Sequence, residues 1–304
     1  MATSSEDINL SLVLSETRRI INAYRNHFSI LSVLFLLPFF ILLFLYPTTF
    51  LNVFESNDCT KSLFLLVLYF VVAFVFSISA TGTFTYSAFH GYYNRPLKLI
   101  TTLKSLSSSF IPLCSTLLVL QLIIFSIGFL IGILGYFIYT LVDSNDENGS
   151  HNSRSFIWTL ILVDIVMLMV LVCIRYLQVN LIIANVIVVV ESKWGYEPLR
   201  RSSYLMKGLR TITLKINMLF GLVSCVFVYG FYWSSWTSDT DTLWVWISKM
   251  VAGSCGMTML VEYSLIANVV MYIYSMKMKG ELGVEIQGDE YVSLNIGDDG
   301  NMFI

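Results

Sequence analysis

The chain has 304 residues, of which 56% are hydrophobic and only 12% are charged. Soluble domains carry about 25% charged residues, so this composition excludes an ordinary soluble globular protein. The net charge of −2 says little about partners, because the positions of the charges matter more than their sum. Apolar runs longer than about 18 residues indicate a polytopic helical membrane protein.

The first segment, residues 1–28, is predicted to be cytosolic. Residues 1–14 are mixed in character and are expected to be loose, whereas from Ser15 the sequence predicts a short amphipathic helix with Ser15 as its cap. One face of that helix carries Ile20, Ile21, Tyr24 and Phe28. The helix is therefore expected to lie on the membrane surface, and no cleavable signal peptide is expected.

Residues 29–275 are predicted to form an all-α bundle of six transmembrane helices with short cytosolic amphipathic helices. The expected spans are about 29–51, 62–88, 110–141, 156–190, 212–234 and 243–275. Pro38 is expected to kink the first span. The third, fourth and sixth spans exceed the roughly 20 residues that a bilayer needs, so they must tilt, kink or extend into water.

The distribution of Lys and Arg orients these spans. Basic residues gather before span one, between spans two and three, between spans four and five, and after span six. The opposite side carries only Lys61 and Arg154, beside several carboxylates. The positive-inside rule therefore places both termini in the cytosol.

Two segments outside the spans give further expectations. The tail, residues 276–304, is acidic, rich in glycine and poor in apolar side chains, so it is predicted to be disordered. Asn148 begins an Asn-Gly-Ser triplet in the predicted lumenal loop between spans three and four. It is a candidate for glycosylation, with a chance match as the alternative.

The loop between spans four and five is the most basic part of the chain. Pro198 suits the first turn of a helix, whose apolar face would carry Leu199, Leu205, Met206 and Leu209. We expect this helix to lie in the interface with its apolar side in the acyl boundary. The candidate contacts to anionic lipid headgroups or cytosolic proteins are Arg200, Arg201, Lys207 and Arg210. The alternative is that these cations only set the topology.

Three stretches carry a resemblance to known families. Residues 188–210, VVVESKWGYEPLRRSSYLMKGLR, resemble the membrane domain associated with glycerophosphodiester phosphodiesterases. Residues 18–39, RRIINAYRNHFSILSVLFLLPF, and 77–96, SISATGTFTYSAFHGYYNRP, are similar to a large uncharacterised plant family of six-span proteins. The resemblance covers most of 15–275 and implies the fold and a setting in a plant endomembrane or the plasma membrane. It does not imply phosphodiesterase activity, which resides in a separate soluble domain.

Predicted span four carries the charged residues Asp164 and Arg175, and span six carries Lys249 and Glu262. An unpaired charge near the bilayer centre costs at least about 2.5–3.5 kcal/mol. The opposite charges lie at matched depths on spans four and six, which predicts the ion pairs Asp164–Lys249 and Arg175–Glu262. Alternatively, Lys249 extends its amine to the lumenal interface.

No arrangement of residues indicates catalysis. His27, His90 and His151 are scattered, and no metal site, cofactor motif or nucleic-acid motif is recognisable. The leading expectation is an integral membrane protein without catalysis, an organiser or adaptor that contacts lipid headgroups or proteins. A transporter or channel for a small solute is the alternative, because of the intramembrane charges. A lipid-acting enzyme ranks third.

Thiol labelling tests the predicted topology. In a chain whose native cysteines are replaced, N148C and R200C are expected to react with a membrane-impermeant reagent from opposite sides of the membrane. The reason is that an odd number of spans separates the two loops. Labelling of both positions from the same side would contradict the six-span arrangement.

Overall fold

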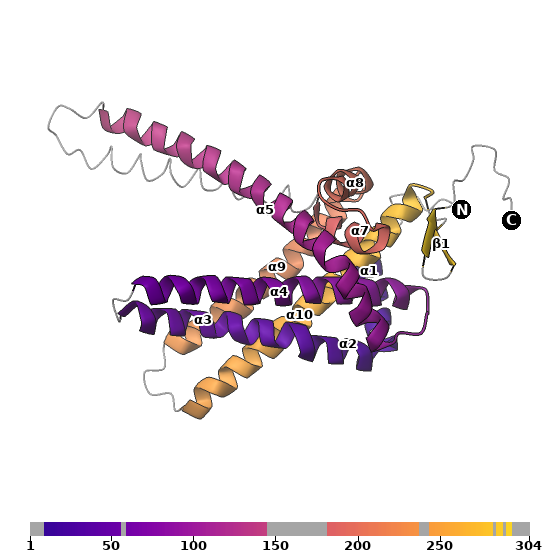
Figure 1. Cartoon of the computed structure of the whole chain (residues 1–304), viewed down its shortest axis with the longest axis horizontal. Coiled ribbons are helices and arrows are strands. Elements are labelled where there is room, and N and C mark those ends of the chain that lie inside the picture. The colour runs from indigo at the N-terminus through magenta and orange to yellow at the C-terminus, as the bar shows by residue number, and fades with distance from the viewer. Residues whose placement is uncertain are drawn as a thin grey trace.

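A computed structural model describes residues 9–55, 59–144, 181–236, 243–281, 284–287 and 290–293 of the chain. Its helices form a bundle in which α3 and α4 run side by side and α10 crosses them (Figure 1). The helices are α1 (Leu10–Ala23), α2 (Arg25–Leu31), the π-helical turn η1 (Ser32–Leu36), α3 (Leu37–Glu55), α4 (Cys59–Tyr92), α5 (Leu99–Ser144), α7 (Ala184–Glu191), α8 (Glu197–Leu205), α9 (Arg210–Trp236) and α10 (Leu243–Met278).

Five segments of the described residues are long and apolar enough to cross a membrane. They are Arg25–Tyr46, Leu63–Tyr92, Leu99–Phe137, Arg210–Phe231 and Trp244–Met278. The expectation of an α-helical membrane bundle is thereby confirmed. The predicted fourth span, 156–190, is described only from residue 181, where α7 forms its end. The number six therefore stays a prediction.

The N-terminal helix differs from its expected start and its expected surroundings. Helix α1 begins at Leu10 after an extended Asn9, and Ser15 lies inside it, donating a hydrogen bond to the Leu12 carbonyl at 2.9 Å. The expected cap at Ser15 and the expected looseness of residues 10–14 are therefore wrong. The apolar face begins earlier than the sequence reading placed it, since Val13 is fully buried.

The apolar face of α1 and α2 packs on protein rather than on the membrane surface. Ile20, Ile21 and Phe28 are all buried, and α1 contacts α10 and α4. The ring of Phe28 stacks on Phe84 of α4, with centroids 5.9 Å apart. The predicted surface helix is thus a helix docked on the bundle, because its face meets apolar side chains of α4 and α10 before it meets lipid.

The irregularity of the helix near Pro38 lies in the turn before the proline. It is the second residue of α3, and the helix immediately before it widens into the π-helical turn Ser32–Leu36. Proline has no N–H for the helical ladder and its ring presses on the preceding turn. A π-helical turn is a common way to absorb that local misfit. The structure thus shows a local widening of the helix before Pro38, and the kink itself stays a prediction.

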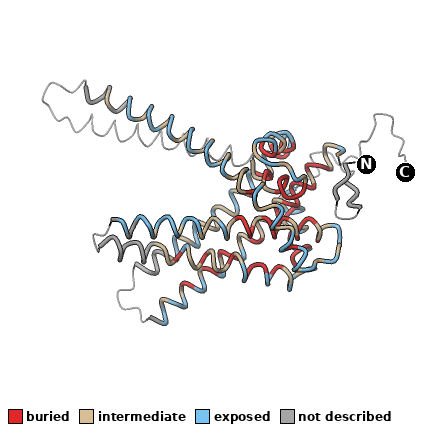
Figure 2. The backbone as a smooth tube through the Cα atoms, in the orientation of Figure 1, coloured by how far each residue is buried: buried red, intermediate tan, exposed pale blue. Residues whose placement is uncertain are grey.

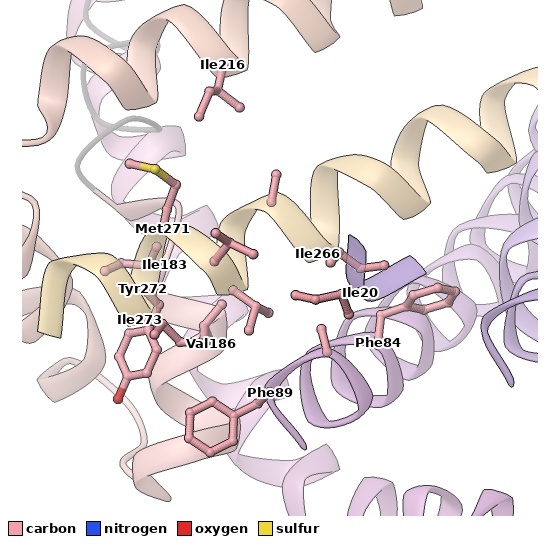
Figure 3. Packing of buried hydrophobic residues seen from close by; sticks show 14 of the residues in the cluster. Ile20, Phe84, Phe89, Ile183, Val186, Ile216, Ile266, Met271, Tyr272 and Ile273 are labelled. Carbon is pink, nitrogen blue, oxygen red and sulfur yellow. The ribbon is translucent and has the colours of Figure 1, made fainter. Parts of the chain in front are cut away.

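The buried core lies at the end of the bundle where α1, α7 and α8 meet the ends of α4 and α10, as the red segments of Figure 2 show. Figure 3 shows residues of four of these helices and of α9 converging there, among them Ile20, Phe84, Val186, Ile216 and Ile266. The outer part of α5 is exposed and extends away from the other described helices (Figure 1). Protein packing is therefore concentrated at one end, which positions the candidate site.

Part of the tail is extended rather than irregular. Strand β1 (Val284–Gln287) pairs antiparallel with β2 (Glu290–Ser293). The register places Ile286 opposite Tyr291 and Glu285 opposite Val292. Aromatic and β-branched side chains favour such pairs. These residues fall within 276–304, so the expected disorder does not describe them, and residues 276–278 belong to α10.

Two phenylalanines on α4 provide a matched test of this packing. Phe84→Ala removes a fully buried ring that stacks on Phe28, whereas Phe64→Ala removes a ring that is 70% exposed. We expect Phe84→Ala to lower the free energy of unfolding by about 3 kcal/mol and Phe64→Ala to change it by less than about 0.5 kcal/mol. Denaturation in detergent measures both, and equal effects would contradict the described packing.

Candidate functional site

The basic loop is folded against the bundle by a sharp turn after α7. Helix α7 ends at Glu191, and Ser192 has a left-handed backbone with φ of 52°. Gly195 has φ of 73°, a value that glycine adopts without strain. Helix α8 follows from Glu197 with Pro198 in its first turn, as the sequence predicts. The turn brings α8 back beside α7, so Glu191 and Arg201 face each other.

The Glu191 carboxylate joins three helices. Its Oε1 accepts a hydrogen bond from Tyr272 Oη of α10 at 3.0 Å and one from Arg201 Nε of α8 at 3.4 Å. Its Oε2 lies 2.9 Å from Lys193 Nζ. Arg201 Nη2 also pairs with Glu281, just beyond α10. One carboxylate at the end of α7 therefore fixes α8 and α10 in place.

Arg201 is a structural cation. Its side chain is 24% exposed, and that of Glu191 is 16% exposed. Burial acts to lower the pKa of Arg201, but the hydrogen bond to Glu281 and the charges of Glu191 and Glu281 raise the pKa above its ordinary value. The guanidinium therefore stays charged and is held by two carboxylates. These contacts differ from the headgroup role that the sequence suggests for Arg201.

The apolar face of α8 and the turn after it exists as expected but meets protein. Leu199, Leu205, Met206 and Leu209 are each at most 2% exposed. Helix α8 contacts α5, α7 and α10. Leu205, Met206 and Leu209 belong to the main hydrophobic core. The expectation that this face lies in the acyl boundary is therefore wrong. The reason is tertiary: the neighbouring helix ends offer an apolar surface that covers it.

The outward side of the loop combines cations with aromatic rings. Arg200 and Lys207 are exposed, and Trp194, Tyr196 and Tyr204 are 69%, 65% and 45% exposed. We call these five residues the basic–aromatic surface. Sequence reasoning found the two cations but missed the rings. Their signal was present, because Trp and Tyr are typical of the membrane–water interface.

The other cations near this surface interact with neighbouring groups. Arg210 begins α9 and is half-buried, in contact with other groups. Lys279 Nζ lies 4.9 Å from the centroid of the Tyr204 ring. Lys277 hydrogen-bonds to Tyr92 and lies over the rings of Tyr92 and Tyr274. Lys277 thus ties the end of α10 to the end of α4, apart from the basic–aromatic surface.

The structure places only part of the intramembrane charges. Asp164, Arg175 and Asn148 lie outside the described residues, so both ion pairs and the glycan stay predictions. Lys249 is half-buried in α10 and has a contact with another group. Glu262 is 5% exposed and accepts a hydrogen bond from Ser32 Oγ at 2.6 Å. Sequence reasoning missed Ser32, which has no charge to mark it.

Each of the two described histidines has a hydrogen-bond partner. His27 Nε2 lies 3.0 Å from Ser87 Oγ, and His90 Nδ1 lies 3.0 Å from the Tyr86 carbonyl oxygen. In the described ranges, no group of three or more His, Cys, Asp or Glu side chains could hold a metal ion. The basic–aromatic surface and the buried Glu262 are therefore the two arrangements from which a function is argued.

A family model described as "Domain of unknown function (DUF8558)" matches residues 47–277. The chain belongs to this family. The matched range begins within α3 and includes Glu191, Arg201, Tyr272, Glu262 and the basic–aromatic surface. It excludes α1, α2 and Glu281. Comparison with curated proteins and with solved structures finds no match to the chain.

Removal of the Glu191 charge tests the carboxylate hub. E191Q leaves Arg201 and Lys193 without their shared anion, so we expect it to lower the free energy of unfolding by about 1–3 kcal/mol. Y272F is expected to cost about 1 kcal/mol, and the double variant less than the sum of the two, because both lose the same hydrogen bond. The matched control E197Q changes an exposed carboxylate. Equal stabilities of E191Q and E197Q would contradict the hub.

Proposed function

We propose that this protein is an integral, multi-pass membrane protein without catalysis that organises membranes by holding anionic lipid headgroups on its basic–aromatic surface. The observation that carries the proposal is the two-sided construction of the loop. Its apolar face is buried in protein and its ion pairs are internal, while Arg200, Lys207, Trp194 and Tyr196 are left exposed. A loop needed only for topology would require charge but no such fixed scaffold.

The basic–aromatic surface adjoins a candidate membrane span along the chain, which supports the proposal. Helix α8 lies between the end of α7 and the start of α9, and the candidate span within α9 begins at Arg210. A Lys or Arg near an anionic leaflet contributes about 1 kcal/mol. Indole and phenol rings prefer the same depth. Two cations beside three rings therefore match the chemistry of a phosphate-bearing headgroup at the boundary of water and lipid.

The proposed setting follows from the same charges. With Lys and Arg retained in the cytosol, both termini and the basic–aromatic surface would face the anionic cytosolic leaflet. The resemblance to plant six-span proteins supports a plant endomembrane or plasma membrane. A cytosolic protein with an acidic surface is the other partner that this chemistry would accept.

A second candidate function is the transport of a small solute. It is favoured by Glu262, a carboxyl group buried within a candidate membrane span. Such residues mark ion and substrate pathways in many membrane proteins, because their burial is costly. This candidate uses the middle of α10 rather than the basic–aromatic surface.

Lipid binding by charge-matched variants tests the leading proposal. Titration of detergent-purified protein with a short-chain phosphatidylserine gives an apparent Kd. Loss of two cations in R200Q/K207Q is expected to weaken binding on the order of tenfold or more, since each contributes about 1 kcal/mol. The control K98Q/K104Q removes the same charge from exposed positions of another predicted cytosolic loop. The proposal fails if both double variants bind as the unmodified chain does.

A further inference from the structure

The middle of α10 carries a buried polar column. Ser254, Thr258 and Glu262 are spaced four residues apart, so they share one face of the helix. Their exposed fractions are 0%, 6% and 5%. Among the described residues, the hydroxyls of Ser254 and Thr258 have no hydrogen-bond partner. Unsatisfied buried hydroxyls are unusual in proteins, and each calls for an explanation.

Ser32 meets this column from η1, the helical turn that packs against α10. Its Oγ donates a hydrogen bond of 2.6 Å to Glu262 Oε2, across η1 and α10, which are in contact. Ser32 is also the first residue of the π-helical turn that precedes Pro38. Because proline supplies no N–H, a backbone carbonyl of this turn is left without its ordinary helical donor. The hydroxyl of Ser32 on η1 therefore meets the carboxyl group of Glu262, and Thr258 lies one helical turn away on the same face of α10.

The Glu262 carboxyl group forms none of the ion pairs found among the described residues. A carboxylate offers about four acceptor positions, and Ser32 fills one in the described structure. Removal of an uncompensated carboxylate from water costs several kcal/mol. A charged Glu262 therefore needs a positive charge beside its oxygens, which none of the contacts found among the described residues supplies.

The charged groups of the elements packed against this part of α10 stand elsewhere. Turn η1 has none, and the nearest along the chain, His27 of α2, is engaged with Ser87 of α4. The others on α2, α3, α4 and α9 lie towards helix ends: Arg25, Glu55, Lys61, His90, Arg210 and Lys215. None of the described groups forms an ion pair with Glu262 by the distances found.

We propose that Glu262, Ser32 and Thr258 form a buried binding site for one small monovalent cation, H⁺ or Na⁺. The carboxylate neutralises the charge. In the Na⁺ form the hydroxyls of Ser32 and Thr258 supply further oxygen ligands. In the H⁺ form the proton resides on the carboxyl group. The site is independent of the basic–aromatic surface, so failure of either proposal leaves the other standing.

Carbodiimide labelling tests the site in the full chain, reconstituted in nanodiscs of zwitterionic lipid. A hydrophobic carbodiimide reacts with a protonated carboxyl group, and mass spectrometry locates the adduct. We expect an adduct on Glu262 in choline buffer at mildly acidic pH, formed about tenfold more slowly for each further pH unit once the proton is lost. E262Q serves to verify the assigned position, and Glu197 is an exposed carboxyl control in the same sample.

The two occupants give different results. A Na⁺ site predicts that Na⁺ slows the labelling at constant pH, that equal K⁺ or choline does not, and that T258V removes the protection. A proton site predicts slowing by pH alone. Absence of an adduct on Glu262, or a rate indifferent to pH and Na⁺, would overturn the proposal in favour of neutralisation by a fixed cation such as Arg175.

Thermal unfolding gives a second measure that does not depend on access of the reagent. The unfolding midpoint of the unmodified chain is expected to change with pH or Na⁺ relative to that of E262Q, which cannot bind the cation through a charge. Midpoints of the two proteins that move in parallel under every condition would also overturn the proposal.

Discussion

The carboxylate of Glu191 is the contact on which the arrangement of the loop depends. It sits at the last residue of α7 and receives Arg201 from α8, Tyr272 from α10 and Lys193 from the turn. Without that anion, Lys193 would lose its described carboxylate and Arg201 would keep only Glu281, which is electrostatically unfavourable beside a largely apolar core. With that anion, α8 is held against α7 and α10, although a helix of nine residues could not be stable alone.

The fixed position of α8 separates the cations that hold the loop together from the cations that stay exposed. Internal ion pairs hold the charges that structure needs, Arg201 and Lys193. The exposed cations Arg200 and Lys207 take no part in the described ion pairs. The aromatic rings of Trp194 and Tyr196 share that outward side. If this surface binds a headgroup as we propose, its fixed position limits the loss of conformational entropy on binding.

The buried end and the sparsely packed end of the molecule serve different requirements. At the end near α8, helices from both halves of the chain bury Phe84, Ile266 and Met271 against one another. In the outer part of α5, large apolar side chains such as Phe125 are 68% exposed. An exposed phenylalanine is costly in water and costs little in lipid. The same sequence property, hydrophobicity, therefore gives protein contact in one place and a lipid-compatible surface in the other.

Hydrophobicity and the placement of charges, read from the sequence alone, determined the helical membrane class, the position of several spans and the existence of an apolar face from Leu199 to Leu209. Each of these depends on local periodicity and composition, which need no knowledge of the fold. Only the tertiary structure decided what those faces touch. The faces of α1 and α8 were expected against lipid and instead pack on protein, since an apolar stripe has the same pattern in either case. The pairing of Glu191 with Arg201 and Tyr272, and of Ser32 with Glu262, joins residues far apart in the chain or across a turn. Such contacts depend on how helices are placed in space, and no spacing in the sequence encodes that placement.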